Sequence, residues 1–119
     1  MILEFVKNIS MANDFQSNWI DMQINNNYSL NDCNLIEAVS LQIFWDSVVG
    51  VLNGYIEIFS TNTINSKAFT ATYNINTASN IDNSILVELN PIFKSIKLVY
   101  HKNGISDGRL NAIINLNNR

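Results

Sequence analysis

The most regular pattern of apolar and polar positions in the chain lies in residues 38–45. Every second residue there is apolar, namely Val39, Leu41, Ile43 and Trp45. Side chains of a β-strand point alternately to its two faces, so the pattern predicts a half-buried strand whose odd-numbered residues face the core. Phe44 is then an aromatic side chain on the more polar face. A turn is expected after this strand, at residues 46–50.

Residues 55–60 predict a second strand, because Ile56 and Ile58 alternate with Tyr55, Glu57 and Phe59 and therefore face the opposite side. The dipeptide Asn53-Gly54 before it predicts a tight turn, since both residue types tolerate positive φ. Further strands are predicted at residues 68–75, 84–89, 93–101 and 108–116. Turn-forming residues at 102–104 and 107–108 separate the last two, which therefore predict a β-hairpin.

The first 35 residues have a less regular pattern. Residues 2–6 and 18–24 can each form a strand, and residues 11–16 can form one helical turn. No apolar stripe of helical period extends over three turns. Seven to nine short strands in 119 residues predict an all-β chain, one domain over residues 1–119, built as a two-sheet antiparallel β-sandwich. Its expected core is Leu41, Ile43, Trp45, Ile56, Ile58, Leu98, Ile114 and Leu116.

Two interpretations are open for residues 1–15. The segment carries several apolar side chains, while the later strands already supply a sandwich without it. It is either the first strand of the domain's own sheet or an N-terminal arm. Such an arm would add a strand to the sheet edge of a neighbouring chain through main-chain hydrogen bonds.

The composition limits the classes of partner. Charged residues make up only 14% of the chain, and 21 asparagines supply much of its polar surface. The net charge is −3 and the seven basic residues are spread singly, so no cationic stripe is expected to neutralise nucleic-acid phosphates. No apolar run reaches the roughly 18 residues of a membrane span, and the N-terminus lacks a secretory-signal pattern. We expect no nucleic-acid or membrane partner and synthesis in a reducing cytoplasm.

Few residues offer reactive chemistry. The single histidine, His101, has no nucleophile motif near it in the sequence, which favours a surface or turn histidine over a catalytic one. Cys33 has no second Cys and no His nearby, so it predicts neither a disulfide nor a metal site. The carboxylates form no calcium-loop motif; they include Asp14, Asp21, Asp32, Glu37, Asp46, Glu57, Asp82, Glu88 and Asp107. We therefore expect that the protein is not an enzyme and has no catalytic residue, cofactor or metal site. The alternative to the absence of a metal site is an ion held by carbonyls and Asp or Asn side chains from separate loops.

The aromatic residues have two interpretations. They can fill the space between two sheets, or line a platform on which sugars stack their apolar faces. The tryptophans and tyrosines that could do either are Trp19, Trp45, Tyr28, Tyr55, Tyr73 and Tyr100. Trp45 and Tyr100 are expected in the core because they lie on or close to apolar strand faces. Tyr55 and Phe59 oppose Ile56 and Ile58, and belong either to a second buried surface or to an interface.

Four stretches carry a resemblance to a known class of protein. They are S-L-Q-I-F-W-D-S-V-V-G (40–50), Y-I-E-I-F-S-T-N (55–62), F-K-S-I-K-L-V-Y (93–100) and S-D-G-R-L-N-A-I-I (106–114). In order and spacing the chain resembles small phage virion proteins, and the layout is similar to discoidin-like jelly rolls. It departs from the discoidin pattern at Thr61-Asn62-Thr63, where an acidic residue is usual, and at Phe69, where a Trp is usual.

The resemblance implies a jelly-roll-like sandwich, with an immunoglobulin-like arrangement as the alternative. It also implies a structural protein of the virion, synthesised in the host bacterial cytoplasm. The expected role is a capsid auxiliary or decoration protein that binds the major capsid protein or other virion proteins, as a homo-oligomer or in many copies. The alternative is a tail or fibre accessory module that binds host glycan through residues such as Tyr55 and Tyr73.

Overall fold

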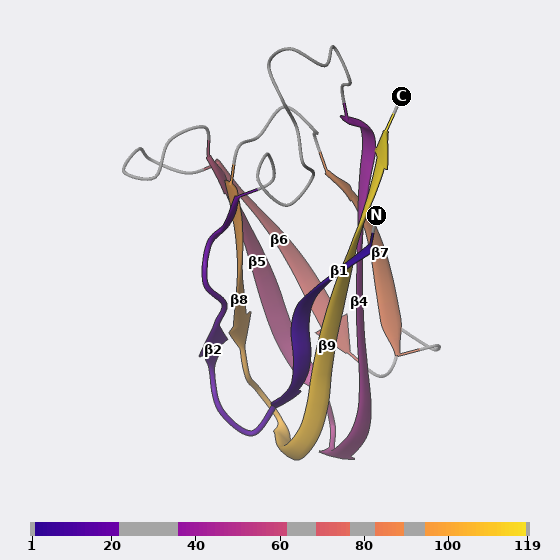
Figure 1. The fold of residues 1–119 in the computed structure, drawn as a ribbon. Coiled ribbons are helices and arrows are strands. Elements are labelled where there is room, and N and C mark those ends of the chain that lie inside the picture. The colour runs from indigo at the N-terminus through magenta and orange to yellow at the C-terminus, as the bar shows by residue number, and fades with distance from the viewer. Residues whose placement is uncertain (1, 22–35, 62–68, 77–82, 90–94, 119) are drawn as a thin grey trace.

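The computed structural model describes residues 2–21, 36–61, 69–76, 83–89 and 95–118, apart from the side chains of residues 21, 36–39, 69, 70 and 116–118. Within these ranges the chain forms strands and no helix (Figure 1). The strands are β1 (Ile2–Ser10), β2 (Phe15–Gln16), β3 (Ile20–Asp21), β4 (Ile36–Gly50), β5 (Asn53–Thr61), β6 (Phe69–Asn76), β7 (Ser84–Leu89), β8 (Ser95–His101) and β9 (Ile105–Asn118).

The strands pair antiparallel in two sheets. The first sheet has the order β1-β9-β4-β7, and the second has the order β2-β8-β5-β6, with β3 also paired to β8. Early strands therefore pair with late ones, β1 with β9, β2 with β8, β4 with β7 and β5 with β6, as in a folded ribbon. Rolling that ribbon brings β4 beside β9 and β5 beside β8. This is the jelly-roll form of an antiparallel β-sandwich, which confirms the predicted fold class.

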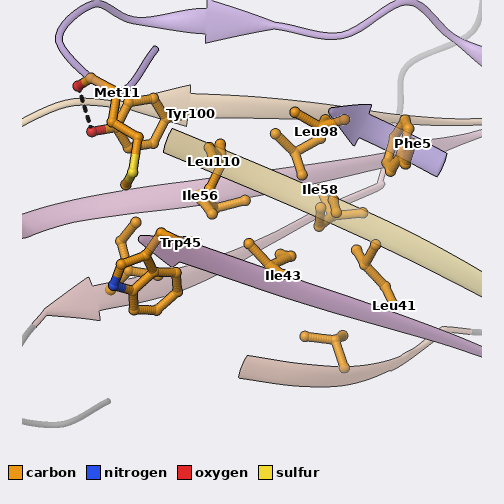
Figure 2. Close-up of a cluster of buried hydrophobic side chains, with 14 of the residues drawn as sticks. Phe5, Met11, Leu41, Ile43, Trp45, Ile56, Ile58, Leu98, Tyr100 and Leu110 are labelled. Atoms are coloured by element: carbon orange, nitrogen blue, oxygen red, sulfur yellow. Dashed lines mark hydrogen bonds between the residues drawn. The ribbon is translucent and has the colours of Figure 1, made fainter. Parts of the chain in front are cut away.

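The core lies between the two sheets (Figure 2). Trp45 pairs with Leu110 and Leu41 with Ile114 in the first sheet, and Ile58 pairs with Leu98 in the second. Antiparallel partners share a face, so these pairs point inward together. Burial is confirmed for the predicted core residues whose side chains are described: Leu41, Ile43, Trp45, Ile56, Ile58, Leu98 and Ile114. The side chain of Leu116 lies outside the described part.

Residues 2–10 form the first strand of the domain's own sheet, which is the first of the two interpretations of the N-terminal segment. β1 pairs with β9 from Ile2↔Asn115 to Ser10↔Arg109. Phe5 and Val6 are buried, and Met11 after the strand is fully buried. The Met11 N–H donates to the Gly108 carbonyl at 2.9 Å, and the Met11 carbonyl accepts from the Tyr100 hydroxyl at 2.9 Å. The segment is thus tied to both sheets.

Three local expectations were wrong. The helical turn expected at residues 11–16 is instead a short turn followed by β2. The turn expected at residues 46–50 is the end of β4, which continues to Gly50 through register shifts and accommodates Ser47 at a φ of 55°. Such bulges absorb turn-like residues without ending a strand. The hairpin expected from residues 93–101 and 108–116 is absent, because β8 and β9 belong to different sheets and β9 begins at Ile105.

A fourth expectation, the tight turn at Asn53-Gly54, was also wrong, because glycines at this end of the sandwich serve close backbone contacts. A Cβ on Gly54 would lie 2.6 Å from the His101 carbonyl oxygen, so this glycine permits close strand approach inside β5 and does not form a turn. Gly104 has a φ of 82°, and a Cβ there would lie 2.1 Å from the Val51 carbonyl oxygen. The Val51 N–H also donates to the Gly104 carbonyl at 3.1 Å. The β4–β5 and β8–β9 connections therefore pack directly on each other.

Deleting residues 1–13 is expected to abolish cooperative unfolding. The deletion removes the buried Phe5, Val6 and Met11 and leaves β9 with an open edge. Urea denaturation followed by tryptophan fluorescence tests this, with Ile2→Ser as the control because Ile2 is 68% exposed. A truncated protein that unfolds cooperatively at the wild-type midpoint would show that β1 does not contribute to the core.

Trp45→Ala is expected to lower the free energy of unfolding by about 3–5 kcal/mol, because the buried ring would leave a cavity. Trp45→Phe should cost less, since it keeps most of the apolar volume and removes an indole N–H that has no hydrogen-bond partner among the described residues. Leu86→Ala is the control: Leu86 is 72% exposed, so the change should stay within about 0.5 kcal/mol. Equal stability of Trp45→Ala and wild type in urea would contradict the packing.

Candidate functional site

The outer surface of the second sheet brings together polar and aromatic residues of β5 and β8. Tyr55 stands opposite His101, Glu57 opposite Val99, and Phe59 opposite Lys97. The alternate residues of the same strands, such as Ile56 and Leu98, are buried between the sheets. Opposite residues share a face, so these three pairs lie on the side of the sheet opposite to Ile56 and Leu98, where Val99 is nevertheless buried at 7% exposed. We call this surface the β5/β8 face; it comprises Tyr55, Glu57, Phe59, Lys97, Val99 and His101.

Tyr55, Glu57 and His101 form a contact cluster on this face. The Tyr55 and His101 rings stack with centroids 4.2 Å apart and planes 14° from parallel. The His101 Nε2 lies 2.5 Å from a Glu57 carboxylate oxygen, and these two side chains are 30% and 24% exposed. The short carboxylate contact fixes the imidazole plane, and the imidazole in turn supports one side of the phenol ring. Tyr55 itself is 39% exposed.

Lys97 forms a second cluster with two aromatic side chains. Its Nζ lies 5.5 Å from the centroid of the Trp19 ring and 5.9 Å from that of Phe59. A cation held over aromatic faces is attracted by the negative face of each ring. Trp19 directly precedes β3, whose residue Ile20 pairs with Ile96 of β8, and this pairing brings the indole to the face that carries Lys97. Trp19 is 37% exposed.

The sequence indicated the position of His101 but not its partners. His101 lies at the end of β8, where a surface or turn histidine was expected, and it is partly buried. Its partners Tyr55 and Glu57 are more than 40 residues away in the chain and come from β5. The alternating pattern of residues 55–60 placed both on one face of a strand. Only the β5–β8 register brings that face to His101.

The remaining aromatic candidates are divided between the two sides of the second sheet. Trp45 and Tyr100 are buried, as expected. Tyr73 is opposite Ile56 and packs against the core, so Tyr55 and Tyr73 lie on different faces and cannot form one platform. Of the two residues that oppose Ile56 and Ile58, Tyr55 is exposed and Phe59 is partly buried, and Val99 on the same face is buried.

Several candidates cannot be placed. Tyr28, Asp32, Cys33, Asn62, Thr63 and Asp82 lie outside the described residues. The side chains of Asp21, Glu37 and Phe69 do as well. Among the described residues, no three His, Cys, Asp or Glu side chains are grouped so that they could hold a metal ion. Within the same ranges, no helix is long and apolar enough to cross a membrane.

An open groove of about 560 Å³ lies between the edge strands β6 and β7. Tyr73 lines it from β6, and Ile85 and Val87 line it from β7, together with neighbouring polar residues. These three side chains point toward the core, since each pairs with an inward-facing residue of the next strand. The groove is thus the margin of the interior between the two sheets.

Tyr100 lies on the inner side of the second sheet and connects it to the N-terminal segment. Its hydroxyl donates to the Met11 carbonyl (Figure 2). Burial raises the pKa of Tyr100 to about 12, and the negative charge of Asp14 adds to the shift. Asp14 is held nearby because one of its carboxylate oxygens accepts from the Lys102 N–H at 2.8 Å.

The fold and the β5/β8 face define the protein as a jelly-roll sandwich with an exposed aromatic and polar surface on one sheet. Comparison with protein-family models finds no match to the chain, and comparison with curated proteins finds none either.

The buried Tyr100 is expected to make the protein sensitive to alkaline pH. The folded state holds the Tyr100 proton more tightly than the unfolded chain, whose tyrosines titrate near pH 10. The stability that Tyr100 provides is therefore complete below pH 10, and it is lost as the pH rises toward 12. The loss should approach roughly 2–3 kcal/mol.

Urea unfolding at pH 8 and at pH 11.5 measures this loss. Tyr100→Phe is the matched variant: it should start less stable, because the Met11 carbonyl loses its donor, and then show a smaller alkaline decline. Asp14→Asn should also reduce the decline, because it removes the charge that adds to the shift. Equal alkaline declines in wild type and Tyr100→Phe would show that Tyr100 is not the group responsible.

Proposed function

We propose that this protein is a non-enzymatic structural component of a phage virion, and specifically a capsid auxiliary or decoration protein that binds the major capsid lattice in many copies. One observation carries the binding role: the outer surface of the first sheet exposes a group of large apolar side chains. We call this group the first-sheet patch; it consists of Ile2, Phe44, Leu86 and Ile113.

The strand register brings the patch together. Gln42 of β4 stands opposite Leu86 on one side and opposite Ile113 on the other. Phe44 is two residues further along the same face, diagonal to both, and within reach of such neighbours. Ile2 lies diagonal to Ile113 across the β1–β9 pairing. Leu86 is 72% exposed and Ile2 is 68% exposed, while Phe44 and Ile113 are partly buried.

The surroundings of the patch favour a protein partner. The residues that stand between its members on β4 and β9 are uncharged, and they include Ser40, Gln42, Asn111 and Asn115. The charged Glu4 and Glu88 stand at the two outer strands of this sheet. Ile2 and Leu86, the most exposed members of the patch, lie on these outer strands as well. The inner strands between them are uncharged over residues 40–44 and 111–115, and depletion of charge is typical of the core of a protein–protein interface.

Two further arguments support the virion assignment. The four stretches that resemble small phage virion proteins correspond to β4, β5, β8 and β9, the inner strands of the two sheets. Jelly rolls occur in viral capsid domains and in lectins.

The proposed function predicts that the protein is present in purified particles in a fixed ratio to the major capsid protein, as measured by quantitative mass spectrometry. Leu86→Glu should reduce its incorporation at least tenfold, because it replaces the most exposed apolar side chain of the patch with a charge that the interface would bury. Val51→Glu is the matched control, since Val51 is 73% exposed but lies outside the patch, in the β4–β5 connection. Absence from particles, or equal incorporation of both variants, would refute the proposal.

A second candidate function is that of a tail or fibre accessory module that binds host glycan. The observation in its favour is the exposed Tyr55 ring, supported from one side by His101 on the β5/β8 face. This candidate uses the outer surface of the second sheet, whereas the first-sheet patch lies on the other sheet. The two functions therefore depend on separate residues and can be tested separately.

A further inference from the structure

We propose that the β5/β8 face binds an uncharged oligosaccharide in an extended orientation along β5, with Tyr55 and Trp19 as its two stacking platforms. The inference deepens the second candidate function and rests on it. It names the residues that would contact the ligand and the class of sugar that they would accept.

Tyr55 and Trp19 are the two aromatic residues among the exposed large hydrophobic side chains of the described chain. Each is held by one polar neighbour on the same face: the Tyr55 ring stacks on the His101 ring, and the Lys97 ammonium lies over the Trp19 ring. Glu57 in turn fixes His101, and Phe59 also contacts the Lys97 ammonium. Rings that are already oriented lose little conformational freedom when a ligand stacks on them.

The distance between the two platforms suits an oligosaccharide rather than a single sugar. Tyr55 and Phe59 are four residues apart on β5, which corresponds to about 13 Å along a strand. Trp19 lies beside the Phe59–Lys97 pair. A ligand that contacts both platforms must therefore cross the intervening surface, and a linear chain of sugar rings has that shape.

The intervening surface presents hydrogen-bonding groups suited to hydroxyls. Gln16, Val99, Glu57 and Thr72 follow one another across β2, β8, β5 and β6 in a single row of paired residues. Gln16 and Thr72 are exposed and Glu57 is partly exposed. Asn74, which stands opposite Tyr55 on β6, is exposed as well. Amide, hydroxyl and carboxylate groups together offer both donors and acceptors to sugar hydroxyls.

The charges of the face favour an uncharged ligand. Glu57 lies between the two platforms, and its carboxylate would repel a phosphate or an acidic sugar placed across it. The cation of the face, Lys97, is already engaged with the Trp19 and Phe59 rings. A chain of net charge −3 adds no general attraction for a polyanion. Neutral hexose oligosaccharides meet these conditions.

Binding of the full-length protein to a glycan array of neutral and acidic bacterial surface oligosaccharides tests the proposal, with isothermal titration calorimetry on the best neutral hit. We expect binding to neutral members. Tyr55→Ala and Trp19→Ala should each weaken it roughly tenfold or more, because each removes a stacking surface. Tyr55→Phe keeps the ring and should bind nearly as well as wild type, which separates stacking from a hydroxyl contact.

Controls distinguish a variant that has lost the binding site from one that no longer folds. Each variant is first checked for a wild-type urea midpoint, and Glu57→Gln, which keeps the shape of the side chain, should weaken binding while leaving the fold intact. Leu86→Glu on the first sheet should bind glycan normally although its incorporation into particles is reduced. Tyr55→Ala should join particles normally, so failure of one proposal does not imply failure of the other. No binding on the array, preference for acidic glycans, or unchanged affinity of folded Tyr55→Ala would overturn the inference.

Discussion

The pairing of β4 with β9 is the interaction on which the rest of the structure depends. It runs from Ile36↔Asn118 to Gly50↔Ile105 and joins two of the longest strands of the described chain, although they are far apart in the sequence. β9 then carries β1 along its other edge, and β4 carries β7. A slip of one residue in this register would turn every core side chain of a strand outward. The β4–β9 pairing thus decides which residues become interior and which become surface.

The same strands supply the core and both proposed binding surfaces. In β5, Ile56 and Ile58 fill the interior while Tyr55, Glu57 and Phe59 form the outer face. In β4, Leu41, Ile43 and Trp45 fill the interior while Phe44 belongs to the first-sheet patch. The inner side chains are buried, and the strand backbone places the outer side chains at regular intervals on the opposite face. Surfaces of this kind suit recognition without a large conformational change.

The two proposed surfaces lie on the outer sides of different sheets, and these sheets are the two layers of the sandwich (Figure 1). A domain that is attached to a particle through the first-sheet patch would leave the β5/β8 face toward solvent. The low charge of the chain is consistent with both roles, since interface centres are depleted in charge and sugars are read mainly by hydroxyl contacts and stacking. Decoration of a particle and recognition of a glycan are then compatible properties of one small domain.

The sequence by itself determined the strand content, the sandwich class and the inward set of each strand, because alternation is a local property with a period of two residues. The alternation in residues 38–45 and 55–60 was sufficient to identify the inward-facing side chains, which are Leu41, Ile43, Trp45, Ile56 and Ile58, and all five are buried. Local turn signals were less informative. Asn53-Gly54 and residues 46–50 lie inside strands, since a bulge or a close strand contact uses the same residue types as a turn.

Tertiary structure alone decided which strands pair. The sequence contains no local signal that β8 and β9 enter different sheets, or that residues 2–10 pair with β9. The association of His101 with Tyr55 and Glu57, and of Lys97 with Trp19 and Phe59, has the same origin. These contacts follow from long-range register, which is set by the combined packing of two sheets and not by any one segment.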